Sequence, residues 1–136
     1  MKRTGSAHWE GDLKTGKGNI STQSTVLNKT QYSYTTRFEN GVGTNPEELL
    51  AAAHAGCFTM AVSLLLGQAG FQATTLDTAA TVTMEGLAII GVHLSIKGKV
   101  PNISAQQFGD VVKAAEKNCI ISKVISAPIS SDAQLL

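Results

Sequence analysis

The chain has 136 residues, enough for one domain with a hydrophobic core. Hydrophobic residues make up 43% and charged residues only 15%, so we expect part of the surface to be covered in an oligomer. The net charge is +1 and no basic cluster is present, which excludes a nucleic-acid-binding surface. The N-terminus lacks the apolar segment of a secretory signal, and two cysteines are too few for a disulfide-stapled secreted scaffold. We therefore expect a cytoplasmic protein.

A three-stranded meander is predicted for the N-terminal part. Short strands are expected at residues 7–10 and 19–24, with glycine-containing turns between them. The third strand, predicted for residues 31–39, alternates strictly, with Phe38 on the aromatic face and Arg37 on the polar face. Arg37 is therefore expected to project from a strand.

A long helix is predicted to begin at Pro46 and to run to about Leu66. Asn45 fits the N-cap, and Glu48 would complete a capping box. Gly67 or Gly70 can end the helix.

Residues 49–66 of this helix carry no formal charge, so their length alone would admit a membrane span. Small and polar residues within the segment, acidic residues before it and the lack of an aromatic belt favour a core helix and no membrane. Because the helix is apolar on nearly all faces, we expect it to be fully buried.

The period of the pattern changes after residue 72. The expected elements are strands at 75–84 and 88–99, a helix at 104–118, a short helix at 120–126 and a closing strand at 128–135. The two strands should form a hairpin with its turn near Gly86, and Cys119 should lie at a break between the helices. The order of strands, central helix, strands and helices predicts an α+β fold, with residues 1–136 in a single domain.

Cys57, in the long helix, is the first candidate for chemistry. A buried structural cysteine is the commoner role. Reactivity requires a thiolate, whereas a free cysteine has a pKa of about 8.5 and is mostly protonated at neutral pH. Since Cys57 lies in the middle of its helix, it gains little from the helix dipole and would need a cationic partner.

Arg37 is the candidate for that partner, because the other arginine, Arg3, lies near the N-terminus. The alternative is an exposed Arg37 paired with Glu39. Glu47 could orient Arg37, or could be only a first-turn acid. Ten residues of one helix span about 15 Å, too far for Glu47 to touch Cys57. Either Arg37 bridges part of this gap, or Glu47 and Cys57 meet across a subunit interface.

The second cysteine, Cys119, lies 62 positions after Cys57. It could condense with an oxidised Cys57 to form a disulfide, but the sequence alone does not place the two thiols within bonding distance. His54 is a candidate base, although a structural histidine is the commoner role. The histidines and cysteines show no metal-ligand spacing, so no metal site is expected.

Four segments of the sequence resemble the OsmC/Ohr family, the osmotically inducible protein C and organic hydroperoxide resistance proteins. They are Ala7-His8-Trp9-Glu10-Gly11, Tyr34-Thr35-Thr36-Arg37-Phe38-Glu39, Gly43-Thr44-Asn45-Pro46-Glu47-Glu48-Leu49 and Ala52-Ala53-His54-Ala55-Gly56-Cys57-Phe58. The resemblance spans nearly the whole chain. The position of Arg37, in the expected third strand, favours the OsmC branch.

The resemblance implies an OsmC-like fold, an intertwined homodimer and a peroxidase that reduces organic hydroperoxides without a metal or cofactor. It assigns Cys57 as the peroxidatic cysteine and Cys119 as the resolving cysteine, with Arg37 and Glu47 activating the thiolate. It also implies a dithiol reductant, with lipoylated proteins serving the Ohr branch. Phe58, Met60 and nearby leucines are candidates to line a pocket for the peroxide.

One departure from the family pattern lies beside the second cysteine. The family usually has Pro-Val-Ser after it, whereas this chain has Ile120-Ile121-Ser122. Replacing proline restores a backbone N–H and frees φ. Two other functions remain open: a redox-sensing or ligand-binding dimer on the same fold, and a structural stress protein with inert thiols.

Overall fold

The computed structural model describes all residues, Met1–Leu136, and has an α+β fold. The chain divides into two compact units, Met1–Leu49 and Leu50–Leu136, and the long helix α2 (Pro46–Gln68) contains the boundary between them. Each unit has its own three-stranded sheet. The expectation of one domain over residues 1–136 therefore stays a prediction.

The first unit contains the expected antiparallel meander. Strand β1 (Gly5–Glu10) pairs with β2 (Lys17–Thr22), which pairs with β3 (Thr30–Tyr32). The rings of Trp9 and Tyr32 pack edge to face across the sheet, 5.4 Å between centroids. Two of the three strands thus lie close to their predicted positions.

The third predicted strand, residues 31–39, is wrong beyond Tyr32. The chain turns there into a short helix, α1 (Tyr34–Phe38), with Ser33 as its N-cap. The amide of Thr36 donates to the Ser33 hydroxyl at 3.3 Å, and the Ser33 amide donates to the Thr36 hydroxyl at 2.8 Å. This reciprocal cap outweighs the alternating pattern, because serine and threonine bond to nearby backbone groups that a strand would need. Arg37 therefore lies on a helix and not on a strand.

The start of α2 follows the sequence signals. The Asn45 side-chain oxygen accepts a hydrogen bond from the Glu48 amide at 2.8 Å, as an N-cap should. The Glu48 carboxylate does not complete a capping box and accepts instead from the Thr44 hydroxyl at 2.7 Å. The Asn45 side-chain amide also donates to the Thr36 carbonyl at 3.0 Å, which ties the helix start to α1.

The end of α2 is set by Gly70, which has a φ of +88°. The Phe71 amide donates to the Leu66 carbonyl at 2.9 Å and the Gly70 amide to the Gly67 carbonyl at 3.1 Å. These two bonds form a Schellman motif, in which a left-handed residue follows the last helical turn. Gly67 itself lies inside the helix.

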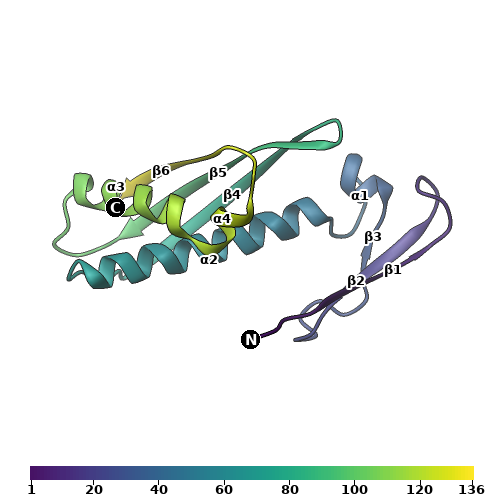
Figure 1. The fold of residues 1–136 in the computed structure, drawn as a ribbon, viewed down its shortest axis with the longest axis horizontal. Helices are drawn as coiled ribbons and strands as arrows, with labels where there is room; N and C mark the ends of the chain where they lie inside the picture. The colour runs from purple at the N-terminus through teal and green to yellow at the C-terminus, as the bar shows by residue number, and fades with distance from the viewer. The chain divides into compact units, whose positions relative to one another are not determined.

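The second unit is built on a mixed sheet in the order β4-β5-β6. Strands β4 (Thr75–Glu85) and β5 (Ala88–Lys99) form the predicted hairpin, and β6 (Ile129–Leu135) runs parallel to β5. Helices α3 (Ala105–Asn118) and α4 (Ile120–Val124) connect β5 to β6 (Figure 1). The core contains apolar side chains from α2, β5 and α3: Phe58, Val62, Leu66, Val92, Leu94, Ile96, Phe108, Val112 and Ala115.

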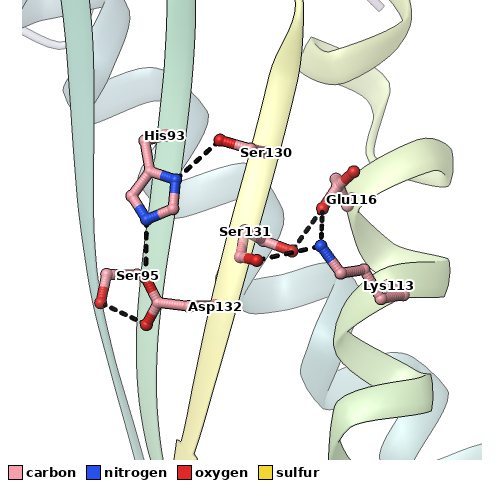
Figure 2. Close-up of polar contacts among 7 residues, drawn as sticks. All are labelled: His93, Ser95, Lys113, Glu116, Ser130, Ser131 and Asp132. Atoms are coloured by element: carbon pink, nitrogen blue, oxygen red, sulfur yellow. Dashed lines mark hydrogen bonds and ion pairs between the residues drawn. The ribbon is translucent and has the colours of Figure 1, made fainter.

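Polar contacts hold β6 on both of its faces (Figure 2). On one face, His93 of β5 lies between Ser130 at 2.7 Å and Asp132 at 2.6 Å. The bond from His93 holds the pKa of Asp132 below its ordinary value. On the other face, the Ser131 hydroxyl donates to the carboxylate of Glu116 in α3. The alternation of contacts along the strand places β6 between β5 and α3.

Helix α2 is not fully buried within the chain, contrary to expectation. Its buried residues are His54, Phe58, Val62 and Leu66, which recur every fourth position and form one face. Met60 and Leu64 on other faces are 75% and 62% exposed. By length and composition α2 could cross a bilayer, although the core helix of a soluble protein meets the same criteria. One face of the helix is therefore buried and the others are exposed, although apolar residues occur on all of its faces.

Two glycines near the end of α2 should respond oppositely to alanine. Gly70→Ala should lower the free energy of unfolding by about 1 kcal/mol, because alanine disfavours the left-handed conformation. Gly67→Ala should raise it by up to about 1 kcal/mol, because Gly67 is helical and a Cβ there meets no atom within 4 Å. Urea unfolding of both variants measures this. Equal effects of the two substitutions would contradict the assignment of Gly70 as the residue that ends the helix.

Candidate functional site

Cys57 and Cys119 line the same apolar pocket in the second unit. The pocket has a volume of about 670 Å³ and its lining residues are Ala53, Cys57, Met60, Ala61, Leu64, Asn118, Cys119, Ile120 and Ile121. Both cysteines are free thiols, with Cys57 half-buried and Cys119 buried. The two thiols lie close enough that each shifts the pKa of the other. The fold thus joins two thiols that lie 62 positions apart in the sequence.

Cys119 is positioned by the break between two helices. Its amide donates to the Ala115 carbonyl at 3.0 Å and ends α3, while its sulfur accepts from the Ser122 amide at 3.4 Å and caps α4. The sequence predicted this break, and the structure confirms it. Because the chain turns at the cysteine itself, the amides of Ile120 and Ile121 lie within reach of Cys57.

His54 and Ser122 form a buried polar pair next to Cys119. His54 of α2 is fully buried, and its Nε2 lies 2.7 Å from the hydroxyl of Ser122 in α4. The other ring nitrogen, Nδ1, is buried without a hydrogen-bond partner. Burial lowers the pKa of His54, so the ring is neutral at pH 7. His54 faces Ser122 and is not placed as a base for Cys57.

The two thiols differ in acidity. Burial raises the pKa of Cys57, and the neighbouring Cys119 sulfur raises it further, against the lowering effect of the Ile121 and Ile120 amides. Burial also raises the pKa of Cys119, but hydrogen bonds from Ser122, from Cys57 and from the Ile121 amide together outweigh it, so the pKa of Cys119 lies below its ordinary value. Within this unit the anion of the pair is therefore favoured on Cys119. Cys57 would need a further positive group to ionise at neutral pH.

Arg37 and Glu47 form an ion pair in the first unit. The Arg37 Nε donates to Glu47 Oε1 at 2.8 Å, which confirms the predicted pairing and replaces the alternative with Glu39. The Glu47 side chain is 13% exposed and the Arg37 side chain 44%. Only one guanidinium nitrogen is used, and Glu47 Oε2 is buried without a partner. The structure therefore groups the four predicted site residues as two pairs, one in each unit.

Several features of the pocket differ from the sequence-based expectation or extend it. Phe58 was a candidate lining residue, but it is fully buried in the core. Met60 and Leu64 do line the pocket. Ser122 had no predicted role. Its position three residues after Cys119, at the spacing of an N-capping bond, was the signal that could have indicated a role for Ser122.

No three His, Cys, Asp or Glu side chains come together as a metal site would require.

Comparison with known proteins identifies relatives along the whole chain. Peroxiredoxin OsmC of Escherichia coli is 49% identical over 139 aligned residues, covering 99% of this chain and 97% of that protein. Organic hydroperoxide resistance protein OhrA of Bacillus subtilis is 34% identical over 90 residues, covering 63% of this chain and 62% of that protein. The higher identity to OsmC supports the branch that the sequence indicated.

Solved structures share the fold. An OsmC-like protein of unknown function from Vibrio cholerae superposes with a TM-score of 0.77 at 12% identity, covering 98% of this chain and 99% of that one. The organic hydroperoxide resistance protein OhrB of Bacillus subtilis gives a TM-score of 0.71 at 22% identity, with 98% of both chains covered. A family profile described as OsmC-like protein matches residues 38–133. On the strength of this match and of the full-length identity to a member, the chain belongs to the OsmC-like protein family.

Proposed function

We propose that this protein is a thiol-dependent peroxidase that reduces organic hydroperoxides to alcohols in the defence against oxidative and osmotic stress. The observation that carries the proposal is that Cys57 and Cys119 line the same apolar pocket. Two relatives bear the names peroxiredoxin and organic hydroperoxide resistance protein, which supports the same reaction class. The proposed compartment is the cytoplasm, where a disulfide formed in catalysis is reduced again.

In the proposed reaction the Cys57 thiolate attacks one oxygen of the O–O bond. The bond breaks, the second oxygen leaves as alkoxide and takes up a proton to give the alcohol, and Cys57 becomes a sulfenic acid. The Cys119 thiolate then attacks the Cys57 sulfur, the S–O bond breaks, and hydroxide leaves to form water. An external dithiol, for which a lipoylated protein is the candidate, reduces the disulfide by thiol exchange.

Arg37 and Glu47 are proposed to activate Cys57. The pKa of Cys57 is raised by its surroundings in the second unit, so the thiolate needs a cation. Arg37 keeps its terminal guanidinium nitrogens available after its Nε bonds to Glu47, and these can donate to the sulfur and to the leaving oxygen. The proposal holds whichever subunit of a homodimer supplies this pair.

The lining of the pocket favours organic substrates. Apart from the thiols and Asn118, its lining is apolar. The pocket should therefore bind the alkyl group of an organic hydroperoxide better than it binds hydrogen peroxide, which has no apolar group.

The exposed Met60, Leu64, Ile120 and Val124 are apolar, and a homodimer would cover such a surface. We propose this homodimer as the active form.

The first test is a single turnover of the reduced protein with one equivalent of cumene hydroperoxide, followed by mass spectrometry. We expect both thiols to be lost with formation of a Cys57–Cys119 disulfide. Cys57→Ser should abolish peroxide consumption, while Cys119→Ser should leave Cys57 as a sulfenic acid that dimedone traps. Cumene hydroperoxide should react faster than hydrogen peroxide.

The two other functions give different results in the same experiment. A redox sensor would form the disulfide once but would not consume excess hydroperoxide when dihydrolipoamide is supplied. A structural protein with inert thiols would keep both cysteines reduced over minutes, and that outcome would sink the peroxidase proposal.

Ile120→Pro should make Cys57 less acidic. Proline removes the Ile120 N–H, one of the two amides that lower the pKa of Cys57, while its fixed φ suits the first position of α4. Oxidation of Cys57 should therefore slow several-fold at pH 7 and approach the original rate above the pKa. Ile120→Ala keeps the amide and is the matched control. If both variants titrate alike, the amide of Ile120 has no role at Cys57.

Arg37→Lys should slow Cys57 oxidation by about 10- to 100-fold, because lysine keeps the charge but loses the fork that can donate to two oxygens or to oxygen and sulfur. Glu47→Gln should have a smaller effect in the same direction. Arg37→Lys should change stability by less than about 1 kcal/mol, since lysine keeps the charge and the Arg37 side chain is 44% exposed. Stopped-flow oxidation and thermal unfolding measure the two effects. Arg3→Lys, at the exposed N-terminus, is the control, and an equal loss there would refute a specific role for Arg37.

A further inference from the structure

Ser122 forms two hydrogen bonds, one with His54 and one with Cys119. Its hydroxyl lies 2.7 Å from His54 Nε2, and its amide lies 3.4 Å from Cys119 Sγ. His54 and Cys119 are 0% and 2% exposed and Ser122 is 7% exposed, so water does not compete for these contacts. The three side chains come from α2, from α4 and from the break before α4.

The unpaired nitrogen of His54 indicates which way the bond to Ser122 points. Neutral histidine carries one proton, on Nδ1 or on Nε2. A buried N–H without an acceptor is rarer in proteins than a buried acceptor without a donor. Since Nδ1 has no partner, the favoured tautomer leaves Nδ1 bare and places the proton on Nε2. His54 then donates to the Ser122 oxygen, and the Ser122 hydroxyl proton is free to point to Cys119.

We propose that His54 and Ser122 are positioning residues for the resolving step, with His54 Nε2–H orienting the Ser122 hydroxyl so that it donates to Cys119 Sγ and holds that sulfur as the attacking anion. The inference rests on the proposed function, because the resolving step belongs to it. The side chain and the amide of Ser122 both lower the pKa of Cys119 against the effect of burial, which agrees with this orientation. Cys57 of α2 is the titratable group that acts on Cys119, and His54 of α2 bonds to Ser122, while Lys117 of α3 and Lys123 of α4 are exposed.

The proposed role of Ser122 meets a requirement of the resolving step, the ionisation of Cys119. Cys119 must lose its proton before it can attack the Cys57 sulfenic acid, and burial alone opposes that ionisation. A donor that is fixed toward the sulfur in a buried site stabilises the anion without reorganisation. When the disulfide forms, the negative charge leaves as hydroxide, and Ser122 retains its bond to His54.

The test uses a Cys57→Ser background, in which Cys119 is the remaining thiol. Thiolate absorbance at 240 nm, followed against pH, reports the ionisation of Cys119 without any peroxide. Ser122→Ala should raise the pKa of Cys119 and lower the thiolate fraction at pH 7 by about tenfold, the change expected when a pKa above 7 rises by one. Ser122→Thr keeps the hydroxyl and is the matched control. His54→Leu should act like Ser122→Ala, His54→Gln should restore part of the effect, and the double variant should add little, because the residues act in series.

A second readout follows the resolving step with Cys57 present. After one equivalent of cumene hydroperoxide, Ser122→Ala should close the disulfide more slowly at pH 7 and recover at higher pH. A Cys119 titration unchanged by Ser122→Ala, with only a lower melting temperature, would overturn the proposal and leave His54–Ser122 as a structural link. If Cys57 does not react with peroxide but the titration still moves, the proposed function fails while the interaction stands.

Discussion

The site depends on one break in the chain, at Cys119. The same residue ends α3 through its amide and caps α4 through its sulfur, so the turn cannot form without placing the thiol inside it. The turn also brings two backbone amides toward Cys57 and the Ser122 side chain toward His54. A single local geometry therefore sets the contact between the thiols, the donors around them and the wall of the pocket.

Helix α2 separates the core from the chemistry by the faces of one element. Phe58 and Val62 pack into the core, whereas Cys57 and Ala61, each one residue earlier, line the pocket. Because neighbouring helical positions lie about 100° apart, a substitution on one face can change stability while leaving the other face in place. The small side chains on the pocket face leave room for an organic substrate that larger residues would fill.

The acidities of the two thiols are consistent with a division of roles. Hydrogen bonds favour the anion on Cys119 within its own unit, whereas burial and the neighbouring sulfur oppose ionisation of Cys57. A cysteine in that environment needs a cation to ionise at neutral pH, and in the proposed mechanism the Arg37–Glu47 pair supplies it. In the proposed mechanism, Cys57 would thus react only when Arg37 lies beside it. The resolving thiol, Cys119, would be ionised by the groups of its own unit.

The sequence by itself determined the elements whose signals are local: the N-cap at Asn45, the β4–β5 hairpin and the break at Cys119. It also identified the family and four candidate residues. It was wrong where two local signals competed, since the Ser33–Thr36 cap replaced the alternating strand that contains Arg37. Only the tertiary structure decided that Cys57 meets Cys119, that Phe58 belongs to the core and that His54 bonds to Ser122. These contacts join residues as many as 68 positions apart, and their geometry is fixed by packing between helices, which periodicity and capping patterns do not encode.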